Sequence, residues 1–352
     1  MLLTIVVFIA VLVLLILTHE FGHLAAAKLS KVKVEEFGIG FPPKSWGIKR
    51  GETIYSINAI PLGGFTRLLG EEDPTAEGSL ASKSIAARIF VLSAGSILNI
   101  LLPILLFTIS FMIPHDVMLE KVLIKDVAAG SPAQAAGIQA GDRIMEINGH
   151  QIRNRGELSY QIQLNLGNDI TMVVQKPDSI EKTIAVKPRW APPQGQGATG
   201  VTLTSADPEV IKESMSFWQA VPNSVTHSWD ILILFRNEVV SWFVRSTGPQ
   251  LAGPIAIAQL TGEVLKAGIS PLLEFTALIS INLGVFNLLP FPGLDGGRLI
   301  FVLLEWVRRG KRISPQKEGM VHMIGFFALL ALILVISYFD VARIIQGDSL
   351  LP

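Results

Sequence analysis

The 352-residue sequence has no cysteine, and its 29 basic and 29 acidic residues leave it without net charge. The absence of cysteine excludes disulfides and thiolate chemistry, so any metal site must use histidine, aspartate or glutamate. The absence of a basic excess gives no reason to expect nucleic-acid binding. Apolar residues, by contrast, make up 50% of the chain. The mean hydropathy of +0.49 favours several membrane spans with a modest soluble part.

The apolar residues are concentrated in four segments that predict transmembrane helices. The first segment runs directly into His19 and Glu20, where a signal peptide would have a small-residue cleavage site, so we expect a retained span. Proline and glycine interrupt the third segment near 290–297, so we expect that span to be broken. The predicted spans cover residues 1–27, 89–113, 272–307 and 320–339.

Lysine and arginine are concentrated in residues 28–88 and 308–317. With four spans these two loops lie on the same side of the membrane, and the positive-inside rule places them in the cytoplasm. Both termini and the long middle segment would then lie outside. We therefore expect residues 1–113 and 271–352 to form the two parts of a membrane-embedded core.

Residues 114–190 predict a small extracytoplasmic α+β domain. Ser131 followed by Pro132 is typical of a helix start, with serine as N-cap and proline in the first turn. Alternating residues lead into Asn148-Gly149, a pair typical of tight turns between strands. The stretch 130–149 resembles a bacterial PDZ domain, and the alternative is another small α+β module. Strands are also expected at 122–127, 170–175 and 182–186, and a helix at 157–164.

Residues 191–270 are expected to form a linker that contains one amphipathic helix. Within it, residues 217–244 combine apolar and charged residues with Trp218, Trp229 and Trp242. Because tryptophan is favoured at membrane interfaces, one interpretation is a helix lying at the outer surface of the bilayer. The other is a helix packed against the soluble domain, and the sequence favours neither.

The first predicted span contains the pattern His19-Glu20-Phe21-Gly22-His23. Histidines four residues apart lie on one face of a helix, so both imidazoles can reach one ion. Glu20 can approach a water at that ion and take its proton without binding the metal itself. Polar side chains in a membrane span need partners or water, which favours a metal site over a polar helix end in the headgroup region.

The third ligand of such a site is expected to be Asp295, because a catalytic zinc normally has three protein ligands and one open position. Asp295 lies in the proline- and glycine-rich break of the third span. Irregular backbone at membrane depth is tolerated where it lines a cavity or is buried in protein, and a carboxylate there indicates function. The alternative is that Asp295 only caps the following helix.

The His-Glu-x-x-His pattern in the first span and Leu294-Asp295-Gly296 in a later, broken one resemble the site-2 protease family of intramembrane metalloproteases. The greatest similarity is to bacterial members that act in regulated intramembrane proteolysis. The resemblance covers nearly the whole chain, including residues 37–42, 61–65 and 287–297. Many relatives carry two PDZ domains, whereas this chain has room for one. The resemblance implies that His19, His23 and Asp295 bind Zn²⁺ and that Glu20 is the catalytic base.

The resemblance also implies substrate-binding residues. Asn287 and Pro290 match positions that hold the substrate chain near the zinc. Gly95 and Asn99 match a motif of the second span close to the active site, which makes Asn99 a further substrate-binding candidate. Ser96 departs from this motif, because family members commonly have proline there. In the family, the region that corresponds to residues 52–65 is a β-hairpin that enters the membrane from the cytoplasmic side. Its edge could pair with an unwound substrate, and a plain cytoplasmic hairpin is the alternative.

The sequence thus predicts a polytopic α-helical membrane protein with four spans and an inserted small α+β PDZ-like domain, in the bacterial cytoplasmic (inner) membrane. Its expected activity is zinc-dependent cleavage of transmembrane segments in single-pass proteins such as anti-sigma factors or signal-peptide remnants. Expected partners are membrane lipid and an upstream site-1 type protease that acts on the same substrate. The alternatives are a membrane zinc transporter or carrier and a non-catalytic PDZ scaffold.

Overall fold

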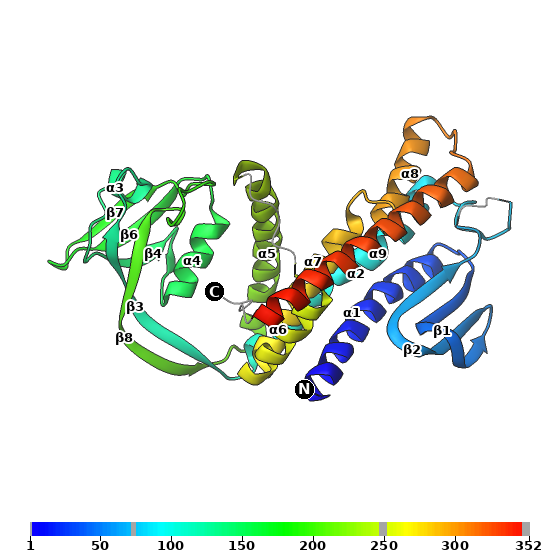
Figure 1. Cartoon of the computed structure of the whole chain (residues 1–352), viewed down its shortest axis with the longest axis horizontal. Helices are drawn as coiled ribbons and strands as arrows, with labels where there is room; N and C mark the ends of the chain where they lie inside the picture. Colours follow the sequence, from blue (N-terminus) through cyan, green and yellow to red (C-terminus); the bar gives the residue numbers. More distant parts are fainter. Residues whose placement is uncertain (1, 72–74, 246–251, 347–352) are drawn as a thin grey trace. The chain divides into compact units, whose positions relative to one another are not determined.

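The computed structural model describes residues 2–71, 75–245 and 252–346 (Figure 1). The chain divides into two compact units, the first formed by residues 1–110 together with 251–352 and the second by residues 111–250. Each unit has its own buried apolar core. The first unit contains the candidate membrane spans, and the second contains the predicted α+β domain.

Four helices in the described residues are long and apolar enough to cross a membrane. Their positions correspond to those of the predicted spans. The predicted third span, residues 272–307, corresponds to two helices, because α7 ends at Leu288 and a further helix, α8 (Asp295–Val307), begins only after the proline-rich break. The four helices are α1 (Leu2–Leu29), α2 (Ile85–Met112), α7 (Ile269–Leu288) and α9 (Pro315–Gln346).

A further helix of the first unit, α6 (Pro254–Ala267), contacts α1, α7 and α9. It lies where the sequence predicted a linker. The N-cap residue of this helix is Gly253, which has no side chain that could cap it. Instead, Asp340 of α9 is buried and its carboxylate accepts a hydrogen bond from the backbone N–H of Ala256 at 3.0 Å. A tertiary contact thus supplies the cap, and the local sequence signal for this helix start is Pro254 in its first turn.

The chain between α1 and α2 forms an antiparallel sheet of two strands, β1 (Val34–Arg50) and β2 (Thr53–Leu68). Both strands bend, so that Phe37 of β1 lies opposite Tyr55 of β2 on one side and Thr66 on the other. Residues 64–68 therefore form one edge of the sheet. This hairpin is longer than the predicted segment 52–65, and β2 contacts α1 (Figure 1).

The second unit contains a sheet in the order β7-β6-β4-β3-β8, with the short β5 paired to β4. All of its strand pairs are antiparallel. Ser131 and Asn154 cap the two short helices with their side chains, as their residue types favour. The elements are β3 (His115–Val127), α3 (Pro132–Ala135), β4 (Arg143–Ile147), β5 (His150–Gln151), α4 (Arg155–Leu164), β6 (Ile170–Gln175), β7 (Glu181–Val186) and β8 (Val201–Glu213).

The predicted linker 191–270 is not a simple connection. It contains β8, which pairs with β3 along nearly its whole length, and the long helix α5 (Phe217–Arg245). The predicted end of the α+β domain at residue 190 is therefore too early, because the sheet continues to Glu213. As an edge strand, β8 has many exposed side chains and lacks a clear apolar alternation.

One face of α5 packs against the rest of the second unit. The side chain of Asn237 donates hydrogen bonds to the backbone carbonyls of Gln163 at 2.8 Å and Leu164 at 3.1 Å. Trp218 and Trp229 are 83% and 64% exposed. The structure thus favours packing against the soluble domain for one face of the helix, and the expectation that the other face lies at the membrane stays a prediction.

Candidate metal centre

The two histidines of the first span lie one helical turn apart on α1, and both are buried. Their Nε2 atoms are 3.2 Å apart. The rings meet edge to face, with an angle of 80° between their planes. Both imidazoles therefore point at the same small volume, as the spacing of four residues predicts.

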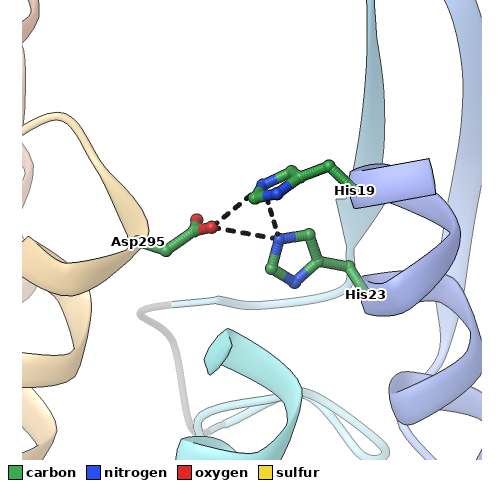
Figure 2. Close-up of side chains that lie close together, drawn as sticks. All are labelled: His19, His23 and Asp295. Atoms are coloured by element: carbon green, nitrogen blue, oxygen red, sulfur yellow. Dashed lines mark hydrogen bonds and ion pairs between the residues drawn. The ribbon is translucent and has the colours of Figure 1, made fainter. Parts of the chain in front are cut away.

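Asp295, the first residue of α8, completes a group of three ligand-type side chains (Figure 2). Its Oδ2 atom is 3.1 Å from Nε2 of His19 and 3.1 Å from Nε2 of His23. This is the one group of metal-ligand type found among the described residues. The structure thus brings together the three residues that the sequence predicted as ligands.

The chemistry of this group fits a metal ion. Nδ1 of His23 lies 2.9 Å from the backbone carbonyl oxygen of Val91. Because a carbonyl only accepts, Nδ1 carries a proton, and a neutral ring in this tautomer presents a lone pair from Nε2. That lone pair faces the carboxylate of Asp295 at 3.1 Å. Two acceptors at that distance repel each other unless a proton or a cation lies between them.

The geometry is also compatible with zinc. Tetrahedral ligands about 2.0–2.1 Å from Zn²⁺ lie roughly 3.3 Å from one another, and the three distances here are 3.1–3.2 Å. Two nitrogens and one oxygen leave a fourth position open, as in catalytic sites. Nδ1 of His19 is buried and has no partner within the described part of the chain. Among the described residues outside the ligand group, the Val91 carbonyl is thus the group that orients an imidazole of this site.

Glycines bring α1 and α2 together at this centre. A Cβ atom at Gly22 would lie 2.5 Å from the carbonyl oxygen of Ala94, and one at Gly95 would lie 2.5 Å from Nε2 of His23. No larger residue fits at either position without displacing backbone or ligand. Gly95, which the family resemblance placed near the active site, is therefore in contact with both histidines.

Asn99, predicted to contact substrate, is fully buried in α2. Its backbone carbonyl accepts a hydrogen bond from Ser280 of α7 at 2.7 Å, and Gly284 packs against its Cβ atom. Its side-chain amide has no partner among the described residues, and nor does the hydroxyl of the neighbouring Ser96. Asn99 thus lies at the contact between α2 and α7, and its role toward substrate stays a prediction.

The break between α7 and α8 is a compact turn. Phe291 N–H donates to the carbonyl of Leu289 at 2.7 Å. A Cβ atom at Gly296 would lie 2.1 Å from the carbonyl oxygen of Leu289, so only glycine fits where α8 folds back onto the end of α7. Asn287 is half-buried in the last turn of α7, and Pro290 is exposed in the turn. Both belong to the segment that leads to Asp295, and neither is in the ligand group.

Glu20, the predicted base, does not belong to the ligand group, and its catalytic role stays a prediction. The edge of the hairpin lies beside it. A Cβ atom at Gly64 would lie 3.4 Å from Cγ of Glu20, and the hydroxyl of Thr66 donates to the backbone carbonyl of Glu20 at 3.0 Å. The position next to His19 therefore lies between the metal-ligand group and the strand edge.

Sequence reasoning missed a buried ion network that joins α2 and α8. Arg88 at the start of α2 and Glu305 of α8 form an ion pair at 2.5 Å, with both side chains 8% exposed. Arg312 contacts the other carboxylate oxygen of Glu305 at 2.9 Å. A lone glutamate within the apolar stretch 299–307 was the available signal, because ionisable residues in membrane segments usually have partners.

His322 lies in the first part of α9. In the structure its Nδ1 atom accepts a hydrogen bond from the backbone N–H of Gly293 at 3.1 Å. Gly293 lies in the break, two residues before Asp295. His322 is therefore connected to the metal centre through the backbone of the break.

The fold and the site together define a polytopic membrane protein with a histidine–histidine–aspartate group that joins its first candidate span to the start of α8. The model of Peptidase family M50 matches residues 7–332, and the chain belongs to this family. This confirms the resemblance to site-2 proteases noted from the sequence.

Two named relatives align with this chain over nearly their full length. A protein of Clostridium acetobutylicum, provisionally named a zinc metalloprotease, is 37% identical over 331 residues, which cover 93% of this chain and 94% of the relative. The zinc metalloprotease RasP of Geobacillus kaustophilus is 28% identical over 424 aligned positions, which cover 97% of this chain and 98% of the relative.

Among solved structures, the PDZ domain of an SdrC-like protein from Listeria monocytogenes covers 24% of this chain and 87% of its own. The identity is 22% and the TM-score 0.22, which is too low to support a shared fold. The description of residues 114–213 as PDZ-like therefore depends on the sequence motif and on the observed α+β architecture.

Proposed function

We propose that this chain is an intramembrane zinc endopeptidase that hydrolyses peptide bonds in the transmembrane segments of single-pass membrane proteins. One observation carries the proposal: the group formed by His19, His23 and Asp295 joins the first span to the break in the third. A metal centre built at that depth reaches peptide bonds that soluble proteases do not. Membership in a peptidase family and the zinc metalloprotease names of its relatives support both the reaction and Zn²⁺ as the cofactor.

The position of the ligands along α1 supports a site below the membrane surface. His19 and His23 lie ten and six residues before the end of α1 at Leu29. At 1.5 Å per residue this is about 9–15 Å of helix. Lys28, Lys31 and Lys33 at that end identify it as the cytoplasmic end by the positive-inside rule. The cut would then fall in the cytoplasmic part of the substrate helix.

The chain's own residues have separate tasks in the reaction. When bound, Zn²⁺ would supply a Lewis acid that polarises the scissile carbonyl and makes water a stronger nucleophile. Glu20 takes a proton from the attacking water and returns it to the leaving nitrogen, which is the role of a general base and then acid. The carbonyl of Val91 holds the ring of His23 in the tautomer that presents Nε2 to the site.

Cleavage requires an unwound substrate, because the peptide groups of a helix are hydrogen-bonded and shielded. The edge strand at residues 64–68 lies beside Glu20 and would hold an extended segment by strand addition. Asn287 and Pro290, on the segment that leads to Asp295, would contact the same segment from the side of the break. Asn99 would act from within α2, through its packing against α7.

The second unit would act before the membrane step. With the basic loops in the cytoplasm, the PDZ-like domain is extracytoplasmic, where it would exclude substrates with bulky external domains or bind their new ends. Such substrates would first be trimmed by a site-1 type protease. Anti-sigma factors and signal-peptide remnants in the bacterial cytoplasmic membrane fit this order of events.

The test compares purified wild-type protein with Glu20→Gln and Asp295→Asn in one detergent or nanodisc system. We expect Glu20→Gln to retain zinc and to cleave a model single-pass substrate at least about a hundredfold more slowly. We expect Asp295→Asn to lose both zinc and activity. Glu181→Gln, an exposed carboxylate of β7, is the matched control and should behave as wild type.

Each alternative function, the zinc transporter and the non-catalytic scaffold, predicts a distinct result in the same system. Zinc flux into sealed vesicles that persists in Glu20→Gln, without cleavage by the wild type, would favour a transporter. A wild-type protein that neither binds zinc nor cleaves would favour the non-catalytic scaffold. Full cleavage by Glu20→Gln would contradict the assignment of the base.

A further inference from the structure

The last span, α9, touches the break that carries Asp295. The imidazole Nδ1 of His322 accepts the hydrogen bond from the backbone N–H of Gly293 at 3.1 Å. Gly325, one turn further along α9, is buried. A Cβ atom at Gly325 would lie 2.0 Å from the carbonyl oxygen of Pro292. The backbones of the break and of α9 are therefore in direct contact, with no side chain between them.

Gly293, in the break, is also close to the backbone of α9. Gly293 has a φ of +97°, which L side chains rarely adopt, and a Cβ atom there would lie 2.9 Å from the backbone nitrogen of Phe326. Gly293 is two residues before Asp295, the residue at which α8 begins. A shift of this backbone relative to α9 would therefore move the carboxylate relative to the two imidazoles.

The choice of histidine at position 322 has a physical explanation in this contact. With Nδ1 as acceptor, the neutral ring carries its proton on Nε2, which is buried without a partner among the described residues. An unpartnered buried N–H group is unfavourable, and a leucine of similar size would avoid it. Within the described part of the chain, the bond to Gly293 is the one hydrogen bond that the imidazole makes, so that bond accounts for the polar residue. The ring of Phe301 lies 5.4 Å from it, centroid to centroid, and fills the adjoining space.

We propose that His322 and Gly325 are positioning residues of the metal centre. They hold the Pro292–Gly293 backbone against α9 and thereby place the carboxylate of Asp295 at the distance that the two histidines require. This inference rests on the proposed function, because it assumes that Asp295 binds Zn²⁺. In known zinc sites, groups that form hydrogen bonds to the ligands hold them in place, and the loss of such a group weakens metal binding about tenfold or more. His322 and Gly325 would act in a similar way, through the backbone that leads to Asp295.

The test uses four variants of the full chain: His322→Leu, His322→Asn, His322→Gln and Gly325→Ala. Asparagine places its carbonyl oxygen the same number of bonds from Cα as Nδ1 of histidine, so it keeps the acceptor. Glutamine places it one bond further out. We expect zinc affinity, measured by competition with a chelator, to fall about tenfold in His322→Leu, His322→Gln and Gly325→Ala. His322→Asn should stay within about twofold of wild type.

A control on the same helix separates positioning from general stability. Asp340→Asn alters a buried carboxylate of α9 that pairs with Arg343 and caps α6, far along the helix from the break. It should lower the thermal unfolding temperature without changing zinc affinity. The asparagine and glutamine variants are equally polar, so their comparison remains informative even if His322→Leu does not fold.

The outcomes are distinct. Wild-type zinc affinity in both His322→Gln and Gly325→Ala would overturn the inference. Equal losses in His322→Asn and His322→Gln would overturn the role of the acceptor. If the wild-type protein itself bound no zinc, the proposed function would be contradicted. If the wild type bound zinc and the variants bound it equally well, only the positioning role would be contradicted.

Discussion

Gly95 of α2 lies so close to His23 of α1 that a Cβ atom at position 95 would come within 2.5 Å of the imidazole Nε2. It would also lie 2.8 Å from the backbone carbonyl oxygen of His19, which cannot move away without bending α1. The ring of His23 is thus confined between two helices, where its Nδ1 donates to Val91. The crossing of α1 and α2 therefore sets the position of a predicted ligand.

Gly95→Ala should accordingly weaken zinc binding. The added methyl group would push Nε2 of His23 away from Asp295, and displaced ligands of this kind lose about 10- to 100-fold in metal affinity. Competition with a chelator measures the effect. Gly197→Ala is the matched control, because nothing lies within 4 Å of a Cβ atom there. Equal zinc affinities of the two variants would contradict the close packing at Gly95.

Removing Glu305 should destabilise the first unit strongly. The side chain of Arg88 is 8% exposed and would be left without its carboxylate, and breaking a buried pair in this way costs about 3–5 kcal/mol. Glu305→Leu should therefore unfold at a clearly lower temperature in the same detergent. The double variant Arg88→Met with Glu305→Leu should recover most of the loss.

A surface pair provides the comparison for this prediction. Lys121 and Asp207 form an exposed ion pair in the second unit, and Lys121→Met should leave the unfolding temperature nearly unchanged. If Glu305→Leu had no larger effect than Lys121→Met, the network around Arg88 would not stabilise the fold.

Thr66→Val should slow cleavage without affecting zinc. The hydroxyl of Thr66 ties the hairpin edge to the backbone carbonyl of Glu20, and valine keeps the shape but not the hydrogen bond. Such a bond contributes about 0.5–1.5 kcal/mol, so we expect cleavage to fall roughly 2- to 12-fold at unchanged zinc content. Thr226→Val removes the same kind of bond from α5 and should cleave as wild type. A loss of zinc in Thr66→Val would place the effect at the metal and not at the substrate.

The start of α4 should respond to acid through Glu120. Its Oε1 atom accepts hydrogen bonds from the backbone N–H of Arg155 at 2.9 Å and from its guanidinium at 3.1 Å. The backbone hydrogen bond from Arg155 lowers the pKa of Glu120 below its ordinary value of 4.5. A carboxyl with a lowered pKa in the folded state stabilises above its unfolded pKa, and this stabilisation is lost as the pH falls through the folded value.

Hydrogen exchange of the Arg155 amide measures this effect. After correction for the intrinsic rate, exchange should be faster at about pH 3 than at about pH 6, because the protonated carboxyl is a weaker acceptor. In Glu120→Gln the corrected rate should no longer depend on pH over this range. The same pH dependence in both proteins would assign it to another group.

The sequence by itself determined the features that depend on short stretches of chain. The spacing of His19 and His23 specifies one face of one helix turn, and long apolar runs specify spans because a bilayer sets their length. Proline and glycine around residues 290–297 favour a break, because both residue types are unfavourable in the interior of a helix. Ser131 and Asn154 capped their helices as their residue types favour.

Only the tertiary structure decided which distant segments meet. Three contacts join residues whose local sequence does not indicate that they meet. They are the pairing of β8 with β3, the cap that Asp340 supplies to α6 and the hydrogen bond between His322 and Gly293. The same is true of Arg88 and Glu305, which are 217 positions apart. Such contacts depend on how whole helices and strands pack, and that packing is a property of the folded chain and not of any short pattern within it.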